Sequence, residues 1–572
     1  MSLDEQNQKG FSRRAFIKGT AISAVGIASA TTLLTGCNND SNSGANAPLD
    51  SEPVTTPSYE IAPSPIPDKD IKSTLDTDVL VVGGGTGGMF AVLSAAESNV
   101  RTMLIEKGSA GAFGPAWMAA VDSSLQKQLG IKLDKDEIVA ELCRYGGHLV
   151  DQRLIRLWAD KSGEAMDWFM PIAEAGGLKT MVETDLKQGF YKSYPVAHIT
   201  FPPDTKATSF PTGGIGSQFY IPVMVKKAQE LGVDIRYKTA LVQLIREEKG
   251  RVTGAIAKDD KGEYIKINAA KGVILCTGGY ARDAEMVTAL SPRALATSLN
   301  VAPLTNTGDG IKAALWIGAA IDPHHSMMVF DRGLVIPGKE LGPPWQGGFL
   351  QLGSQPFLKV NQKGERFVNE DLPYDYCWDA ALMQPGQTWW QVWDNNWQQD
   401  VERFHNIFCS RIIPDPGAPP RAGLEAIEQE ITKLAEMGII KKANSIEELA
   451  KQMGVPASAL NATVTRYNEL AKQGQDLDFG KTAGKLSTLA APPYYAANLA
   501  GLLICNLNGL RVNTKLEVLD KDHQVIPGLY AAGNDSGSFF AFNYPELLGG
   551  IALGRTATFG RLSGLSAAGA SY

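Results

Sequence analysis

Three glycines and a carboxylate have the types and the spacing of a dinucleotide-binding site. Gly83, Gly85 and Gly88 follow a short apolar run at residues 79–82, and Glu106 ends a second apolar run about 20 residues farther on. Gly83 lets the chain turn sharply, Gly85 lets a pyrophosphate approach the backbone, and Gly88 lets a helix pack closely on the preceding strand. A carboxylate at the position of Glu106 accepts hydrogen bonds from a ribose. The stretch therefore predicts a strand–turn–helix–strand unit that binds FAD or a nicotinamide cofactor.

The size and composition of the chain indicate a globular protein with more than one domain. A chain of 572 residues is too long for one compact core. Its apolar content of 44% and charged content of 20% are ordinary for a globular protein. The net charge of −7 argues against a nucleic-acid partner, and beyond the N-terminus no apolar run is long enough to span a bilayer.

The first 37 residues have the pattern of an export signal. Arg13 and Arg14 precede an apolar run at residues 21–34, which is too short for a membrane span. Twin arginines before such a run resemble a Tat signal, and the letters LTGC ending at Cys37 resemble the lipobox where bacterial lipoproteins are acylated. We expect an extracytoplasmic protein that contacts the membrane only through a lipid on Cys37. The alternative is an ordinary signal with an incidental cysteine.

Between this signal and the first glycine motif, residues 38–74 are rich in Asn, Ser, Pro and Ala and show no apolar periodicity. Such a composition predicts a flexible linker.

The cysteines do not form a local metal-binding motif. After Cys37 they are scattered, with no C-x-x-C pair and no C-x-x-C-H haem site. We expect buried free thiols and no metal; an iron–sulfur cluster built from distant cysteines is the alternative.

The apolar patterns that follow predict alternating helices and strands. Helices are expected at residues 154–170 and 222–231, and strands at 233–237, 241–246 and 252–257. A further strand at residues 272–276 leads directly into Thr277-Gly278-Gly279-Tyr280.

The order of these and later segments resembles a known flavoprotein family. The letters NTGDG at 306–310, GERFVNE at 364–370, PGLYAAGN at 527–534 and GG at 549–550 follow the glycine motif collinearly. This order is similar to that of the fumarate reductases, succinate dehydrogenases and 3-ketosteroid dehydrogenases. The resemblance implies an α/β fold, in which a discontinuous Rossmann-type FAD-binding domain at 75–320 and 476–572 is interrupted by an α+β capping domain at 321–475.

The resemblance also implies FAD as the cofactor and names the residues that would hold it. The family's covalent flavin histidine has no counterpart in the loop at residues 108–117, so we expect non-covalent FAD. The expected FAD-binding residues are Gly83, Gly85, Thr86, Gly87, Gly88, Glu106, Lys107, Thr277, Gly278, Gly279, Asp309, Gly533, Asn534, Gly549, Gly550 and Ile551.

The positions at which family fumarate reductases bind a dicarboxylate carry other residues here. The family's His and Arg positions fall on or near Phe330, Tyr374, Ile504-Cys505 and Tyr544. A doubly charged substrate would lose its hydration without compensating partners, at a cost of several kcal/mol per ion. We therefore do not expect fumarate or succinate as substrate.

Tyrosines take the place of these charged residues. Tyr374 and Tyr544 resemble tyrosines of the 3-ketosteroid dehydrogenase branch, where one phenol exchanges a proton with a substrate carbon and another donates to a ketone oxygen. Tyr194, with Tyr191, is a third candidate for proton transfer. Glu546 is either a solvated loop carboxylate or an additional acid or base. The late apolar side chains favour a flat apolar or aromatic substrate: Phe539, Phe540, Phe542, Leu547 and Leu548.

The preferred hypothesis is an extracytoplasmic FAD-dependent oxidoreductase that acts on a CH–CH bond beside a carbonyl. It would reduce an α,β-unsaturated carbonyl compound with electrons from a separate cytochrome or quinol dehydrogenase. One alternative is a ketosteroid-like dehydrogenase that runs the same site in the oxidative direction. Another is a non-catalytic surface lipoprotein that retains FAD.

Overall fold

The core of the structure is a sheet with parallel strands at its centre. The computed structural model describes residues 56–572 except 112–113, 115–116, 187–188, 205–215, 325, 407 and 419–422. The first sheet consists of β1 (Ile71–Val82), β2 (Thr102–Ile105), β6 (Asp234–Arg236), β7 (Ala240–Arg246), β8 (Val252–Lys258), β9 (Tyr264–Leu275), β17 (Glu517–Leu519) and β18 (Val525–Ala531). Along the order β17-β18-β9-β1-β2-β6, the strands from β18 to β6 are parallel, and β8 joins β9 antiparallel.

Burial explains why these segments form a parallel core. The apolar end of β1 and the whole of β2 are buried, and strands covered on both faces read as continuous apolar runs. The predicted strands correspond to β6, β7, β8 and the end of β9. The helices α5 (Gln152–Ala175) and α6 (Tyr220–Glu230) also lie where the sequence predicts them. The predicted α/β class with a parallel sheet is confirmed.

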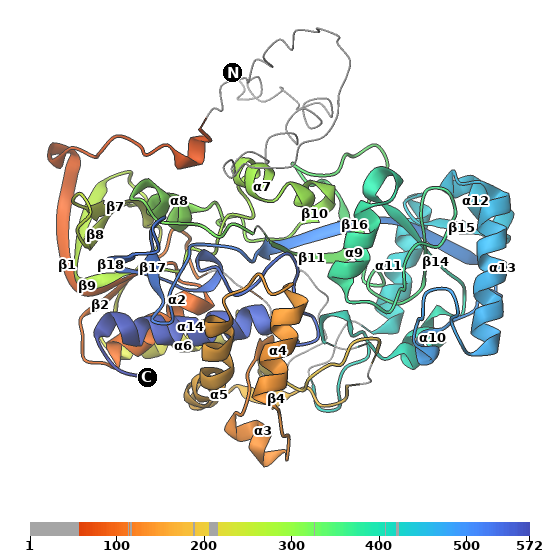
Figure 1. The fold of residues 1–572 in the computed structure, drawn as a ribbon, viewed down its shortest axis with the longest axis horizontal. Helices are drawn as coiled ribbons and strands as arrows, with labels where there is room; N and C mark the ends of the chain where they lie inside the picture. Colours follow the sequence, from red (N-terminus) through yellow and green to blue (C-terminus); the bar gives the residue numbers. More distant parts are fainter. Residues whose placement is uncertain are drawn as a thin grey trace, which may run out of the picture. The chain divides into compact units, whose positions relative to one another are not determined.

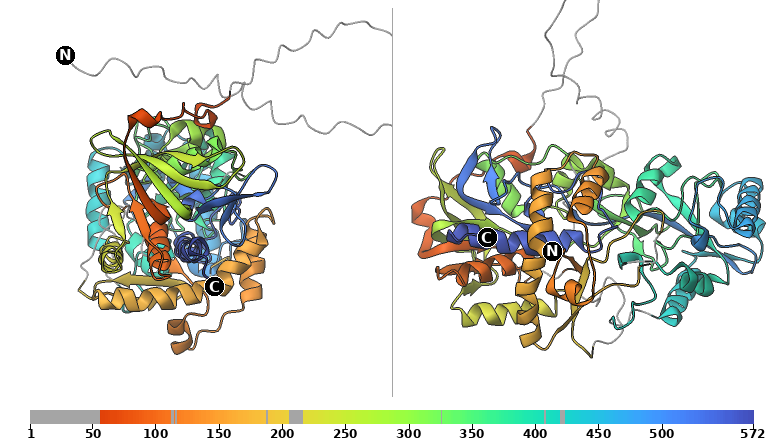
Figure 2. Two further views of the ribbon diagram at one scale, coloured as in Figure 1. Left: turned by 90° about the vertical axis from the view of Figure 1, so that its left-hand side faces the viewer. Right: turned by 60° about the horizontal axis from the view of Figure 1, so that its bottom comes forward.

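Two helices lie side by side on this sheet and pack through glycines. They are α2 (Thr86–Ala96) and α14 (Ile551–Ala568), and the left view of Figure 2 shows α14 end-on beside α2. A Cβ on Gly560 would lie 2.4 Å from the backbone oxygen of Gly87, and a Cβ on Gly564 would lie 2.2 Å from that of Ala91. No residue larger than glycine fits at these two positions. The glycines therefore allow α14 to pack directly against α2.

A second sheet is built around one long strand, β16. Its strands are β10 (Thr297–Asn300), β11 (Met327–Leu334), β12 (Gly348–Phe349), β13 (Leu358–Val360), β14 (Trp389–Trp393), β15 (Lys441–Ala443) and β16 (Tyr494–Asn506). β16 pairs with β10, β11, β14 and β15 (Figure 1). Both β10 and β16 lie outside the range 321–475 that the sequence assigns to the cap. The segments that flank the cap thus contribute to its sheet.

Helices of the cap accompany this sheet, and α9 packs on β11. They are α9 (Tyr374–Leu382), α10 (Trp397–Phe404), α11 (Leu424–Glu436), α12 (Ile446–Met453) and α13 (Ala457–Gln473). The remaining elements are α3 (Ser124–Gln128), α4 (Lys135–Tyr145), α7 (Ala284–Leu290), α8 (Asp309–Trp316) and a small sheet of β3 (Trp117–Ala119), β4 (Lys179–Val182) and β5 (Ala197–Phe201).

The described part of the predicted linker is folded. Trp316 Nε1 donates to the carbonyl of Tyr59 at 2.9 Å, and Gln243 Nε2 donates to that of Ser64 at 2.9 Å. The first strand already begins at Ile71. A flexible linker up to residue 74 is therefore wrong for residues 56–74, which are held by these contacts and by the start of β1. The predicted export signal, Cys37 and the earlier part of the linker lie outside the described residues.

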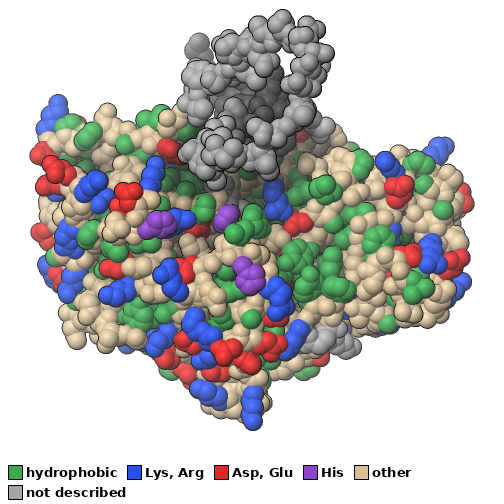
Figure 3. All heavy atoms as spheres, viewed as in Figure 1, with side chains coloured by type: hydrophobic (Ala, Val, Ile, Leu, Met, Phe, Trp, Pro, Cys, Tyr) green, Lys and Arg blue, Asp and Glu red, His purple; other side chains and the backbone are tan. Residues whose placement is uncertain are grey.

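The surface combines charges of both signs. Figure 3 shows acidic and basic side chains interleaved over α4 and α5, where Arg156 pairs with Asp136 at 2.5 Å. Among the helices of the described ranges, none has the length and apolar character to cross a bilayer.

Candidate active site

The predicted cofactor segments meet at one edge of the first sheet. The strands β1, β2, β9 and β18 end at Val82, Ile105, Leu275 and Ala531. Each is followed directly by a predicted segment: the glycine turn, Glu106, the Thr277 turn and Gly533-Asn534. Because these strands are parallel, all four segments lie at the carboxyl edge, which is where α/β sheets bind ligands.

The glycine turn closes around the start of α2 as a dinucleotide requires. Gly83 has a φ of +106°, and a Cβ there would lie 2.1 Å from the carbonyl oxygen of Cys276. A Cβ on Gly88 would lie 1.8 Å from the carbonyl oxygen of Gly83. Gly85 is the N-cap of α2 and provides no side-chain cap. The first amides of α2 therefore remain available to a phosphate.

Two charged residues after β2 face the same edge. Glu106 is buried, and its two carboxylate oxygens accept from the backbone amides of Gly84 and Gly108, each at 2.7 Å. The neighbouring Lys107 Nζ donates to Asp309 Oδ2 at 2.7 Å at the start of α8. The predicted residues Glu106, Lys107 and Asp309 are thus brought together.

A carboxylate that the sequence did not single out joins two of the segments. Asp535 is buried, and its carboxylate accepts from the amides of Thr277 and Gly279 and from the Thr277 hydroxyl. Burial raises the pKa of Asp535 to about 6. Its position two residues after Gly533 is the only sequence signal that pointed to it. The contact holds the Thr277 turn against the loop at 533–535.

The N-terminus of α14 completes the edge. Gly550 has a φ of +80°, and a Cβ there would lie 2.5 Å from the carbonyl oxygen of Trp117. As the N-cap it offers no side-chain hydrogen bond, but the amide of Ile551 donates to the carbonyl of Leu548 at 3.1 Å, and the amides of Gly550 and Ala552 face the Tyr544 hydroxyl. The positive end of this helix favours negative charge.

The predicted tyrosines form a buried stacked pair. The ring centroids of Tyr374 and Tyr544 are 6.1 Å apart, and the ring planes are inclined by 12°. Phe330, at the position of the family's cap histidine, lies with its ring centroid 4.2 Å from that of Tyr374. Tyr374 Oη is buried and has no hydrogen-bond partner among the residues that the structure describes. An unpaired buried hydroxyl is costly, so its presence indicates a function other than stability.

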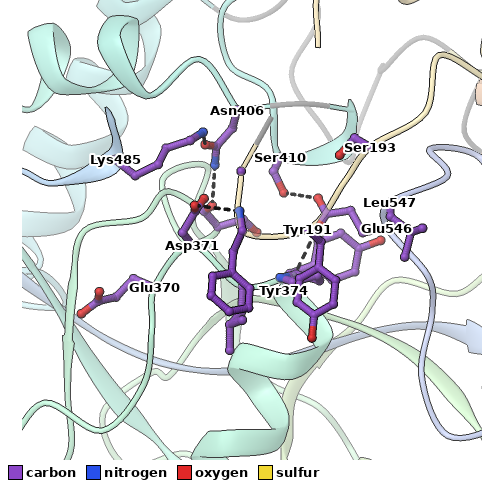
Figure 4. Close-up of a pocket in the computed structure, with 15 residues that line it drawn as sticks. Tyr191, Ser193, Glu370, Asp371, Tyr374, Asn406, Ser410, Lys485, Glu546 and Leu547 are labelled. Carbon is purple, nitrogen blue, oxygen red and sulfur yellow. Dashed lines mark hydrogen bonds between the residues drawn. The ribbon is translucent and has the colours of Figure 1, made fainter. Parts of the chain in front are cut away.

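A cavity with a volume of about 60 Å³ lies beside Tyr374 (Figure 4). We call it the Tyr374 cavity. Segments of the cap and of the two flanking parts of the chain contribute to its wall. The wall consists of residues 189–191, 193, 370–374 and 546–547, with Ser354, Asn406, Ser410 and Lys485.

Glu546 lies in the wall of this cavity, and the interpretation as a solvated loop residue is wrong. Its side chain is buried because it docks against the cap, where it accepts from Ser410 Oγ at 2.6 Å and from the amide of Tyr374 at 3.2 Å. Burial raises the pKa of Glu546 to about 7. At neutral pH this carboxyl therefore exists in both protonation states.

The third predicted catalytic residue, Tyr194, is not part of the cavity wall. Its hydroxyl donates to Glu137 Oε1 at 2.9 Å, and burial raises its pKa. Its neighbour Tyr191 does line the cavity and is 36% exposed. The structure thus brings Tyr374 and Tyr544 together and leaves the Tyr194 hydroxyl with Glu137.

A family model described as an FAD binding domain matches residues 78–553. The chain belongs to this family of FAD-binding proteins. The glycine cradle, the uncapped N-terminus of α2 and Glu106 all fit FAD, so the cofactor is FAD. The resemblance inferred from the sequence motifs is confirmed.

Similar proteins place this flavoprotein among enzymes that act on carbon–carbon bonds. A vinyl phenol reductase of Lactiplantibacillus plantarum is 28% identical over 499 residues, covering 86% of this chain and 96% of that protein. A 3-oxosteroid 1-dehydrogenase of Mycolicibacterium smegmatis is 28% identical, covering 86% of this chain and 97% of that protein. The open conformation of a flavocytochrome c3 fumarate reductase matches with a TM-score of 0.62 at 26% identity, covering 86% of this chain and 78% of that chain. The protein is an FAD-dependent oxidoreductase that acts on CH–CH bonds.

The described cysteines take no part in the cofactor edge as metal ligands. Cys143, Cys276, Cys377 and Cys505 are buried free thiols. No group of His, Cys, Asp and Glu side chains within the described ranges is arranged to hold a metal ion.

Proposed function

We propose that the protein reduces the carbon–carbon double bond of an apolar or aromatic α,β-unsaturated carbonyl compound. The observation that carries this proposal is the buried Tyr374 hydroxyl, whose ring stacks on Tyr544 and which has no hydrogen-bond partner in the described part of the chain. A substrate oxygen or carbon would provide the missing partner.

Reduction needs a hydride at one carbon and a proton at its neighbour. Bound reduced FAD supplies the hydride. Burial raises the pKa of both Tyr374 and Tyr544 well above the usual range, so both phenols are protonated at neutral pH. A protonated phenol can donate a proton to a carbon or a hydrogen bond to a developing enolate, whereas it is a poor base. Both phenols are thus in the protonated state that a reduction requires.

The surroundings favour a substrate without a second carboxylate. Phe330 packs on Tyr374, and Leu547 lines the cavity. The cation in the wall, Lys485, is engaged by the Phe404 carbonyl and by Asn406 Oδ1, each at 2.6 Å. The similarity to a protein named as a vinyl phenol reductase supports an aromatic unsaturated substrate.

We further propose that electrons arrive from a separate cytochrome or quinol dehydrogenase, outside the cytoplasm. This rests on the Tat-like twin arginines, on the lipobox-like sequence ending at Cys37, and on the lack of a C-x-x-C-H haem site in the 572 residues. Non-covalent FAD belongs to the same proposal.

A second candidate runs the same site in the oxidative direction, as a dehydrogenase of a ketosteroid-like ketone. The observation in its favour is the similarity to a 3-oxosteroid 1-dehydrogenase together with the Tyr374–Tyr544 pair. It would show itself by bleaching of the oxidised FAD spectrum when a saturated ketone is added without oxygen. The raised pKa values of both phenols argue against it.

The decisive experiment is anaerobic reoxidation of the enzyme with viologen reduced by dithionite as the electron donor. The panel contains enones, enoates and vinyl phenols, with fumarate and the saturated analogue of each compound as controls. We expect at least one aromatic unsaturated compound to be reduced and fumarate to be inactive. If no unsaturated compound reoxidises the enzyme, the reductase proposal fails.

A further inference from the structure

The proposed function gives roles to the two phenols and none to the carboxyl of Glu546. It is bound from two sides, by the Ser410 hydroxyl and by the amide of Tyr374, which is the first residue of α9 (Figure 4). Glu546 and Tyr374 both belong to the wall of the Tyr374 cavity. Such a cavity has room for a water molecule that could join a carboxyl to a phenol.

A second buried carboxyl follows Tyr374 directly. Asp375 is 1% exposed, and the hydroxyl of Tyr145 donates to both of its carboxylate oxygens, at 2.8 and 2.9 Å. Tyr145 is half-buried and stacks on Tyr376, with ring centroids 4.7 Å apart. Tyr376 in turn contacts Tyr191, which is partly exposed and lines the cavity. Asp375 is thus hydrogen-bonded to Tyr145, which is joined through its ring contact with Tyr376 to Tyr191 in the cavity wall.

We propose that Glu546 is the proton-relay residue of this site, and that it passes protons from the Tyr145–Asp375 pair to the cavity in which Tyr374 donates. The inference rests on the proposed function. When Tyr374 gives its proton to the substrate carbon, its O–H bond breaks and a phenolate is left. Glu546 then gives up its proton through a water in the cavity, and the phenolate regains its O–H bond. The Glu546 carboxylate is reprotonated from the side of Asp375.

The charges around Glu546 support a carboxyl that exchanges its proton near neutral pH. Burial is the main cause of its raised pKa; Asp331 raises the pKa further, whereas Arg332 and the hydrogen bonds from Ser410 and the Tyr374 amide lower it. Burial and the proximity of Glu546 also raise the pKa of Asp375 well above its usual range. Glu546 also interacts electrostatically with Tyr145, Tyr374, Tyr544 and Cys377. The cavity wall contributes four further titratable groups: Glu370, Asp371, Tyr191 and Lys485.

The test uses Glu546→Gln in the full FAD-loaded enzyme. The glutamine keeps both hydrogen bonds, because its oxygen accepts from the Tyr374 amide while its nitrogen donates to the Ser410 hydroxyl, which rotates to accept. The variant cannot release a proton. Glu430→Gln is the matched control: it removes a carboxyl on α11 whose pKa is likewise raised to about 7 by burial, but which is not part of the cavity wall. Glu546→Asp restores a carboxyl.

We expect the wild-type kcat for the unsaturated substrate to fall as the pH rises through about 7, the pKa of Glu546. Glu546→Gln lowers kcat by about 100-fold, within the range of a lost acid, and flattens this limb of the pH profile. KM and the FAD spectrum stay unchanged. Glu430→Gln keeps the wild-type kcat and its fall above about pH 7. Glu546→Asp recovers part of the kcat and part of this pH dependence.

A second readout needs no turnover. Infrared titration of the oxidised protein is expected to show two carboxyls that lose their protons near pH 7 in wild type. Glu430→Gln loses one of these signals and keeps the other, whereas Glu546→Gln loses the signal of the Glu546 carboxyl. If this carboxyl is missing while kcat and its pH profile are unchanged, Glu546 holds a proton but relays none, and the relay is refuted. If wild type reduces no unsaturated compound, the proposed function fails, and an ionised Glu546 at pH 6 would overturn the relay independently.

Discussion

The rings of Tyr374 and Tyr544 lie nearly parallel, inclined by 12° with centroids 6.1 Å apart, although the residues are 170 positions apart in the chain. Tyr374 begins α9 of the cap, and Tyr544 lies in the loop that leads to α14. The pair therefore exists only when the cap and the C-terminal loop are docked on each other.

Tyr374→Phe is expected to separate activity from stability. It removes a hydroxyl without a partner, so turnover should fall by about 100-fold or more, as for a lost general acid. Stability should hold or rise, because an unpaired buried polar group costs about 1–3 kcal/mol. Steady-state reduction and thermal unfolding of the holoprotein measure the two effects.

Tyr467→Phe is the matched control for that variant. The Tyr467 hydroxyl is also buried but accepts from Lys481 Nζ at 2.6 Å, in the cap. Its loss should lower stability by about 1–3 kcal/mol and leave kcat unchanged. A Tyr374→Phe enzyme with full turnover would remove Tyr374 from the mechanism.

Tyr544→Phe tests the second phenol. The Tyr544 hydroxyl would donate a hydrogen bond to the developing enolate oxygen. Loss of this donor should lower kcat by about 10²–10³-fold, the range seen when one oxyanion donor is removed. The absorbance spectrum of bound FAD should be unchanged, since the ring remains in place. Full activity of this variant would leave Tyr544 with a packing role.

Gly88→Ala should abolish FAD binding. The added Cβ would lie 1.8 Å from the carbonyl oxygen of Gly83, which is backbone and cannot move without opening the turn. The ratio of FAD absorbance to protein absorbance after gel filtration measures the loss. Gly484→Ala is the control, because nothing lies within 4 Å of its Cβ position; equal FAD content in both variants would contradict the prediction.

Acid precipitation should release the flavin. The loop at residues 108–117 contains no histidine for covalent attachment, so the precipitated protein should be colourless, with FAD in the supernatant. Flavin that stays with the denatured protein would show a covalent link.

A buried histidine predicts how stability depends on pH. His198 Nε2 lies 2.8 Å from Ser123 Oγ, and burial lowers the pKa of His198 to about 4. Between about pH 6.5, where an unfolded histidine titrates, and pH 4, the unfolded chain binds the additional proton, so stability falls as the pH falls, by about 3 kcal/mol in total. In thermal unfolding, wild type should exceed His198→Gln in free energy of unfolding by a constant amount above pH 6.5. This difference should shrink as the pH falls toward 4. A constant difference would contradict this.

The cofactor edge could be predicted from the sequence because single-residue properties decide it. A glycine is required at Gly83 and Gly88 because no Cβ fits, and this requirement is visible in the letters themselves. The strands that position these glycines are continuous apolar runs, which the sequence also displays.

The substrate side could be predicted only in part. Tyr374 and Tyr544 were found because they replace charged residues at recognisable positions. The burial of Glu546 depends on Ser410 and Tyr374, which are 136 and 172 positions away, and no local pattern reports such contacts. The Tyr194 hydroxyl likewise donates to Glu137, which is 57 positions away in the chain.

The central position of β16 has a consequence for how the chain is made. During synthesis β11 and β14 leave the ribosome long before β16, the strand that both require as a partner. Until residue 506 has emerged, the cap has open strand edges that can pair with other chains. The sheet of the cap therefore closes late in synthesis, and a chain that stops after β14 is expected to aggregate rather than to form a partial cap.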